Sequence, residues 1–140
     1  NYKNCADLAA AIQEACPEGV DVYFDNVGGP TLDAMLINMK PFGRVIGCGM
    51  IAGYNNQDAP PPILHMWELV SRQLMMKGFL LFSYANSIPA ALKQLEAWIA
   101  SGGIKVIENK KVGLANAASL FSDLMGGRTI GKSVLEVDLI

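Results

Sequence analysis

Residues 20–29 read VDVYFDNVGG, a short run of β-branched, aromatic and apolar residues that closes on two glycines. Such a run is typical of a strand buried on both faces, and the glycines are typical of a turn that follows it. A helical pattern, TLDAMLINMK, comes next at 31–40, and RVIGCG at 44–49 predicts a second buried strand. This strand–helix–strand order predicts a parallel sheet of β-α-β units with helices on its faces.

The alternation of helices and strands extends in both directions from this stretch. Apolar spacing and capping residues predict further helices at 6–16, 65–77, 87–103 and 115–125. Apolar or alternating runs predict further strands at 78–84, 105–112 and 132–138. The last part of the chain holds fewer apolar runs, which indicates a different structural unit there. We therefore expect an α/β fold that ends in a strand–helix–strand segment.

The composition excludes several classes of protein. Of the 140 residues, 51% are hydrophobic and 17% are charged, so the chain can bury the core of a domain and is not intrinsically disordered. A net charge of −2 without a basic stripe excludes a nucleic-acid-binding protein. No apolar stretch approaches the roughly 20 residues of a membrane span. The apolar content slightly exceeds the usual range, which indicates apolar surface that contacts something outside this chain.

Metal-binding and secretory patterns are not found in the sequence. The three cysteines, Cys5, Cys16 and Cys48, have no spacing typical of a metal site, and we expect reduced thiols in a cytoplasmic protein without a signal peptide. His65 is the single histidine, and only Glu68 could share a helical face with it. Two such ligands do not make a metal site, so no bound metal is expected.

Ligands of open α/β sheets bind beyond the carboxyl ends of the strands, which directs attention to the residues after each predicted strand. Asn26 offers a donor and an acceptor, and the glycines after it allow close backbone approach, although a tight turn alone explains them equally simply. The glycine-rich segment 47–53 could lie along a flat or phosphorylated ligand, but it is not the usual dinucleotide fingerprint. The segment Phe82–Tyr84 lies at the carboxyl end of the third predicted strand.

Three side chains near the ends of these strands could carry chemistry. Asp25 is a better functional candidate than Asp21, which stands at the start of its strand. Tyr54 could orient a ligand hydroxyl or donate a proton, and Cys48 could be a nucleophile, although an exposed tyrosine and a small buried cysteine are commoner explanations. The residues alone thus predict an α/β domain that binds a nucleotide-like ligand, without specifying a reaction. A methyltransferase core is an alternative, which the GYN loop argues against.

Four segments occur together in a specific order: VDVYFDNVGG, MKPFGRVIGCGMIAGYN, GFLLF and TIGKSVLEV. This combination resembles the zinc-independent medium-chain dehydrogenase/reductases, and within them the prostaglandin/leukotriene-type and 2-alkenal (enone) reductases that use NADPH. The resemblance implies that residues 1–103 form the C-terminal part of an NADP-binding Rossmann-type domain, with a partial parallel sheet and flanking helices. It implies that residues 104–140 pack with a GroES-like substrate domain.

The resemblance also implies residues for the cofactor site. Tyr2 would contact the adenosine ribose end of NADP, and Asn26 would lie at the cofactor. The loop beside the nicotinamide would be formed by Cys48, Gly49, Met50, Ile51, Ala52, Gly53 and Tyr54. The backbone facing the nicotinamide amide would belong to Phe79, Leu80 and Leu81. Thr129 stands where the family commonly has an asparagine, and its hydroxyl could replace one of two hydrogen bonds.

The activity implied by the resemblance is hydride transfer from NADPH to the β-carbon of α,β-unsaturated ketones and aldehydes. Tyr54 would be the catalytic residue, engaging the nicotinamide ribose and helping to position or protonate the enone. A quinone reductase of the same superfamily and a non-catalytic nucleotide-binding or oligomerisation fragment are alternatives. A homodimer through the 78–84 edge strand is expected. The family's substrate domain and glycine-rich pyrophosphate loop have no counterpart in these residues, so we expect a C-terminal part of a larger reductase, inactive and weak in NADPH binding by itself.

Overall fold

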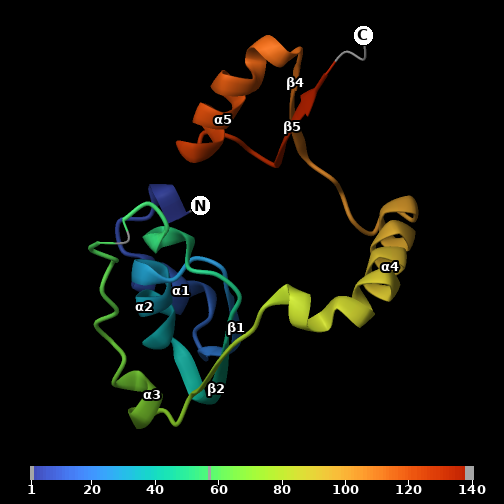
Figure 1. Cartoon of the computed structure of the whole chain (residues 1–140). Helices are drawn as coiled ribbons and strands as arrows, with labels where there is room; N and C mark the ends of the chain where they lie inside the picture. Colours follow the sequence, from blue (N-terminus) through green and yellow to red (C-terminus); the bar gives the residue numbers. More distant parts are fainter. Residues whose placement is uncertain (1, 57, 138–140) are drawn as a thin grey trace. The chain divides into compact units, whose positions relative to one another are not determined.

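The computed structural model describes residues 2–56 and 58–137. The chain forms two compact units, Asn1–Ala85 and Asn86–Ile140, each with its own parallel sheet (Figure 1). We call them the first and the second unit. No helix among the described residues is long and apolar enough to cross a membrane.

The first unit is a three-stranded parallel sheet in the order β1-β2-β3, with helices between the strands. Its strands are β1 (Val20–Asp25), β2 (Met39–Gly47) and β3 (Met75–Gly78). Its α-helices are α1 (Leu8–Ala15), α2 (Gly29–Leu36) and α3 (Glu68–Ser71). Short 3₁₀ turns lie at Tyr2–Asn4, Ile51–Gly53 and Leu81–Ser87. The predicted α/β fold class, with a parallel sheet and flanking helices, is confirmed.

The helices of the first unit begin and end at residues suited to these positions. The Asp7 side chain caps α1 by accepting a hydrogen bond from the Ala10 N–H at 3.0 Å. Gly28 caps α2 with φ 67° and ψ −158°, a backbone conformation that is essentially restricted to glycine. Pro30 follows in the first turn of α2, where its missing N–H costs no helical hydrogen bond. The chain therefore turns from β1 into α2 within a few residues.

The strand register aligns the carboxyl ends of all three strands. Asp25 pairs with Gly47, and Gly47 pairs with Gly78. Nearer the start of β1 the register with β2 shifts, because Val20 pairs with Met39 but Val22 pairs with Arg44. The extra residues of β2 bulge out there, and the irregularity lies at the end of the sheet away from Gly47.

One face of the sheet packs into the core of the first unit. Its buried members are Leu32, Leu36, Met39, Val45 and Leu74. On the opposite face, Val22, Phe24 and Met75 are each more than half exposed within the described structure. Within the first unit no described element covers this second face, so the expectation of strands covered on both faces stays a prediction.

The second unit contains one long helix followed by a strand–helix–strand motif. Its elements are α4 (Ile88–Ala100), β4 (Glu108–Val112), a 3₁₀ turn (Leu114–Asn116), α5 (Ala117–Met125) and β5 (Lys132–Glu136). β4 and β5 pair in parallel from Glu108↔Lys132 to Val112↔Glu136. The predicted strand–helix–strand segment at the end of the chain is therefore present. The expected domain boundary between 103 and 104 stays a prediction.

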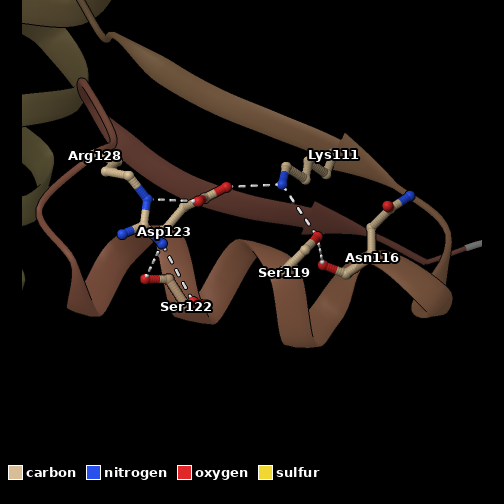
Figure 2. A network of polar contacts seen from close by, with 6 residues as sticks. All are labelled: Lys111, Asn116, Ser119, Ser122, Asp123 and Arg128. Carbon is tan, nitrogen blue, oxygen red and sulfur yellow. Dashed lines mark hydrogen bonds and ion pairs between the residues drawn. The ribbon is translucent and has the colours of Figure 1, made fainter.

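A polar network fastens α5 to its neighbours in the second unit, as Figure 2 shows. Asp123 on α5 accepts a hydrogen bond from Lys111 Nζ on β4 at 2.9 Å and another from Arg128 Nε at 3.0 Å. Lys111 also donates to Ser119 Oγ at 3.1 Å. Hydrogen bonds from Lys111 and then Arg128 lower the pKa of the Asp123 carboxyl. The network joins strand, helix and the segment after the helix, so it is structural.

The segment 65–84 differs from the prediction. The helix expected at 65–77 is confined to α3, because Gln73 adopts φ 52° and reverses the chain before β3 starts at Met75. The strand expected at 78–84 lies earlier, at Met75–Gly78, and Leu81–Ser87 forms a 3₁₀ turn. The pairing partner explains the shift: β2 ends at Gly47, and the Phe79 N–H makes the final bond to the Gly47 carbonyl at 3.0 Å. The edge strand proposed for a homodimer is therefore not formed at 78–84.

Candidate functional site

A cleft lies at the aligned carboxyl ends of β1, β2 and β3, with a volume of about 770 Å³. Six of the residues implied for the cofactor line it: Cys48, Gly49, Met50, Tyr54, Phe79 and Leu80. Its remaining wall comes from Asp25, Leu32, Gly47, Met76, Gly78 and Ser83. The rule that ligands bind beyond the carboxyl ends of parallel strands thus leads to a cavity in this molecule.

Six lining residues are not among those that the resemblance implies for the cofactor. Gly47 belongs to the glycine-rich segment 47–53 predicted to lie along a ligand, and the strand register brings Gly78 beside it. Met76 falls within the predicted helix 65–77, so its position on β3 does not follow from the sequence. Asp25 is a functional candidate from the sequence, and Ser83 lies in the segment Phe82–Tyr84. Only Leu32, on α2, carried no signal other than its helical spacing.

Several predicted site residues lie elsewhere. Asn26, Ile51, Ala52 and Gly53 belong to the turn and loop beside the cleft, but their side chains do not line it. Their proposed roles, like those of the residues in the cleft, stay predictions.

Three further residues of the prediction do not line the cleft or cannot be placed against it. Leu81 is 59% exposed and stands between the lining residues Leu80 and Ser83 without lining the cleft itself. Tyr2 lines a different cavity of about 390 Å³ beside α1. Thr129 belongs to the second unit, so it is described only within that unit. The structure thus brings four residues of the predicted nicotinamide loop together with Phe79 and Leu80, which follow β3, and it leaves Tyr2 at a separate cavity.

The turn after β1 holds the loop after β2 through main-chain hydrogen bonds. The Asp25 carbonyl accepts from the N–H groups of Cys48 at 2.7 Å and Gly49 at 3.1 Å. The Asn26 carbonyl accepts from the Ile51 N–H at 3.2 Å. The Val27 carbonyl accepts from the Ala52 N–H at 3.0 Å. We call residues 25–28 the β1 turn and residues 48–54 the cleft loop.

The β1 turn is itself shaped by the Asp25 carboxylate, which is 1% exposed. Its Oδ1 accepts hydrogen bonds from the N–H groups of Val27 at 2.8 Å and Gly28 at 2.9 Å. The same oxygen accepts from the Tyr23 hydroxyl at 2.8 Å. Burial, followed by the hydrogen bond to and the charge of Asp25, raises the pKa of Tyr23 above its ordinary range. Tyr23 therefore keeps its proton and remains a donor to Asp25.

Glycines leave the floor of the cleft open. A Cβ added at Gly47 would meet no neighbouring atom nearer than 3.9 Å, and one at Gly78 none nearer than 3.8 Å. Both residues line the cleft, so the main chain there is bare and accessible. Gly49 is more confined, because its Cβ would lie 3.2 Å from Tyr54 Oη. A flat ligand can approach this surface more closely than it could approach side chains.

Tyr54 provides a hydroxyl group at the cleft. The residue is 57% exposed, and its Oη accepts a hydrogen bond from the Met50 N–H at 3.2 Å. Among the described residues the hydroxyl hydrogen of Tyr54 has no acceptor. The phenol is thus held by the cleft loop as an acceptor and can donate its own hydrogen to a ligand.

Within the described residues, no three histidine, cysteine, aspartate or glutamate side chains come together in a way that could hold a metal ion. His65 does not line the cleft and instead faces Asp33, with 2.7 Å between Nδ1 and Oδ2. The absence of a metal stays a prediction. The cleft can bind a planar ligand over its glycines and can donate a hydrogen bond from Tyr54.

The sequence profile described as zinc-binding dehydrogenase matches residues 1–135. The chain belongs to the zinc-binding dehydrogenase family. This membership confirms the resemblance to the medium-chain dehydrogenase/reductases, whereas the zinc independence inferred with it stays a prediction.

Reductases are among the relatives of this member of the zinc-binding dehydrogenase family. It is 39% identical over 137 residues to a 2-alkenal reductase (NADP(+)-dependent) of Nicotiana tabacum, covering 98% of this chain and 40% of the relative. It is 34% identical over 137 residues to prostaglandin reductase 1 of Sus scrofa, and this match covers 97% of this chain and 42% of the relative. The crystal structure of CurA in complex with NADPH from Vibrio vulnificus matches with a TM-score of 0.83 and 31% identity, over 98% of this chain and 42% of that one. The chain thus spans about 40% of the length of the curated relatives it matches.

Proposed function

We propose that this chain is part of an NADPH-dependent oxidoreductase that reduces the C=C bond of α,β-unsaturated ketones and aldehydes. The observation that carries the proposal is the Tyr54 hydroxyl, whose hydrogen has no acceptor among the described residues, at a cleft lined by the glycine backbone of Gly47 and Gly78. The relatives support it, since a 2-alkenal reductase and a prostaglandin reductase are among them. A cytoplasmic location and a single enone substrate class belong to the same proposal.

The cleft fits the nicotinamide end of NADPH. Gly47 and Gly78 leave room for a flat ring against the main chain, because neither residue carries a side chain and both line the cleft. The cleft loop and the residues after β3 would hold the ring, with Met50 and Leu80 among its neighbours. The cofactor supplies the hydride when it is bound. The Phe79 N–H is already bonded to the Gly47 carbonyl, so it is not available to the carboxamide group.

This chain's own residues would orient the substrate and exclude water. Apolar side chains of Leu32, Met76 and Leu80 line the cleft and lower the local dielectric constant, which strengthens a hydrogen bond made there. Tyr54 would donate its hydroxyl hydrogen to the carbonyl oxygen of the enone. That bond becomes stronger as negative charge develops on the oxygen, which is the condition for lowering the barrier.

Replacing Tyr54 with phenylalanine in the full-length protein that carries this chain tests the proposal. We expect kcat/KM for trans-2-hexenal to fall about 100-fold, as is typical when one donor to a developing oxyanion is removed. We expect the Kd for NADPH to change far less. Tyr84→Phe is the matched control, since Tyr84 packs edge-to-face on Phe79 through its ring and does not line the cleft.

Retention of full activity in Tyr54→Phe would overturn the role of the hydroxyl. A parallel assay with a quinone separates the two reductase alternatives, because a quinone reductase would prefer that substrate over the enal. A wild-type protein that binds NADPH but reduces neither would support the non-catalytic alternative.

A homodimer is also part of the proposal. Its support is an apolar exposed segment after β3, in which Leu80 is 69%, Leu81 59% and Phe82 86% exposed. Exposed apolar clusters of this kind are typical of association surfaces. Size-exclusion chromatography of the full-length protein should give a dimer, and a monomer at all concentrations would contradict it.

A further inference from the structure

The cleft loop is held in place almost without contributions from its own side chains. Its N–H groups at Cys48, Gly49, Ile51 and Ala52 donate to carbonyls of the β1 turn. Among the described residues, the hydrogen bond from the Met50 N–H to Tyr54 Oη, at 3.2 Å, is the one that uses a side chain of the loop. The position of Tyr54 therefore depends on the three carbonyl groups of residues 25–27.

Those three carbonyls point to the loop only if the β1 turn has the conformation seen here. The turn is unusual, since Gly28 has φ 67° and ψ −158°. A Cβ at Gly28 would also lie 3.2 Å from Met50, so the turn and the loop are in close contact. The Asp25 Oδ1 fixes this conformation by accepting from the N–H groups of Val27 and Gly28.

Asp25 is unlike a surface turn residue in its burial. It is 1% exposed, lines the cleft and takes a third hydrogen bond from the Tyr23 hydroxyl at 2.8 Å. Loss of the carboxylate would leave buried donors without an acceptor, which is costly in a site of low dielectric constant. A new turn conformation would then be favoured, and the carbonyls that hold the loop would move with it.

We propose that Asp25 is a positioning residue of the cofactor site, which sets the conformation of the β1 turn and, through its carbonyls, the cleft loop and the Tyr54 hydroxyl. The proposal deepens the proposed function, on which it rests for the identity of the ligand. Asp25 does not react in it, and the acceptor oxygen matters rather than the charge.

Two substitutions of Asp25 separate the acceptor from the charge. In Asp25→Asn the side-chain oxygen can still accept from Val27 and Gly28, whereas in Asp25→Ala no acceptor remains. Hydrogen exchange of the cofactor-free full-length protein is measured at the amides of Cys48, Gly49, Ile51 and Ala52. We expect exchange there to be at least about tenfold faster in Asp25→Ala and within about threefold of wild type in Asp25→Asn.

Cofactor binding gives a second readout on the same variants. The Kd for NADPH, measured by calorimetry, should rise about tenfold in Asp25→Ala. The KM for NADPH should rise by a similar factor, whereas kcat at saturating NADPH should fall by a smaller factor. Asp25→Asn should restore the wild-type Kd. If Asp25→Ala does not fold, Asp25→Ser takes its place, because a serine hydroxyl reaches a neighbouring turn N–H more weakly and should give an intermediate loss.

Wild-type loop exchange and wild-type NADPH affinity in a folded Asp25→Ala or Asp25→Ser variant would overturn the inference. An Asp25→Asn variant as impaired as Asp25→Ala would also overturn it, since the charge would then be the important property. A wild-type protein that does not bind NADPH defeats the proposed function instead, and the exchange experiment still decides whether Asp25 positions the loop.

Discussion

Asp33, on α2, holds the segment that precedes α3 by three contacts. Its Oδ1 accepts from the N–H groups of Leu64 at 2.6 Å and His65 at 2.7 Å, and its Oδ2 lies 2.7 Å from His65 Nδ1. Burial alone would raise the pKa of Asp33, but hydrogen bonds from the His65 backbone and ring and from the Leu64 backbone outweigh it and lower the pKa. Folding therefore stabilises the ionised form of the Asp33 carboxyl group.

The lowered pKa of Asp33 predicts a pH dependence of stability. A carboxyl group with a lower pKa in the folded state stabilises the protein fully above its unfolded pKa of about 4, and this contribution is lost as pH falls through the folded pKa. In urea unfolding from pH 7 to pH 2, the free-energy difference between wild type and Asp33→Asn should therefore be constant down to about pH 4 and shrink below it. A difference that stays constant to pH 2 would contradict the assignment.

Individual side-chain roles were the least predictable part of the molecule. Asp25 could be singled out because an aspartate followed by Asn-Val-Gly-Gly is a turn signal at the end of a strand. Its three hydrogen bonds, and its effect on a loop more than twenty residues away, depend on the sheet register. Asp33 carried no signal at all, because its partners lie 31 and 32 residues further along the chain.

The end of α3 has a hydrogen-bond pattern that usually requires glycine. The Gln73 N–H bonds to the Val70 carbonyl, and the Leu74 N–H bonds to the Leu69 carbonyl at 2.9 Å. Gln73 has φ 52°, the left-handed conformation of the Schellman motif. Leu74 and Leu69 both pack on the core, which is the apolar contact that accompanies this motif.

Glycine at this position should stabilise the protein. Gln73→Gly removes the left-handed penalty of a residue with a Cβ, and the greater freedom of glycine in the unfolded chain offsets part of the gain. We expect a net stabilisation of about 0.5–1 kcal/mol in urea unfolding. Gln73→Ala keeps the Cβ and is the matched control, expected to be nearly neutral. A less stable Gln73→Gly variant would contradict the strain at this residue.

Element prediction succeeded where periodicity and end signals agree. The helices α1, α2, α4 and α5 and the strand β1 fall within a few residues of their expected bounds, because glycine, proline or a capping residue stands close to their ends. The strand β2 begins at Met39, five residues before its expected start at 44, because Pro41 and Gly43 lie inside the strand and do not mark its beginning. The segment 65–84 failed for the opposite reason. Glutamine is not a typical residue for a left-handed helix end, so the sequence does not predict that α3 ends before Gln73. The residues on both sides of Gly78 are apolar, so the sequence does not show where the strand ends. The end of β3 is set by its neighbour β2.

The isolated 140-residue chain should bind NADPH weakly or not at all. Its cleft suits a planar apolar group, but no lysine or arginine is among the described residues that line it, and phosphate groups need such donors or a helix N-terminus. Isothermal titration calorimetry on the isolated chain tests this expectation. A Kd in the micromolar range would show that the chain supplies the main affinity for the cofactor by itself.

The apolar surplus in the composition has a counterpart on the surface. Phe82, Leu64 and Trp67 are 86%, 74% and 69% exposed, and Phe24 on the sheet face opposite the core of the first unit is 52% exposed. Composition predicted such surfaces, although it could not say where they are. The fold class, the location of the cleft and the family followed from sequence, whereas the division at Ala85 and Asn86 did not, since no glycine or proline stands at that point.

The backbone attachment of the cleft loop affects which residues of the cleft can be substituted without disturbing its structure. Hydrogen bonds from Gly49, Ile51 and Ala52 to the β1 turn are made by main-chain atoms, so they survive most replacements of the side chains beside them. Cys48 and Met50 line the cleft and can vary in size while the frame stays in place. Directed evolution toward a new substrate should therefore find its productive mutations at these two positions, with Asp25 and Gly28 left untouched.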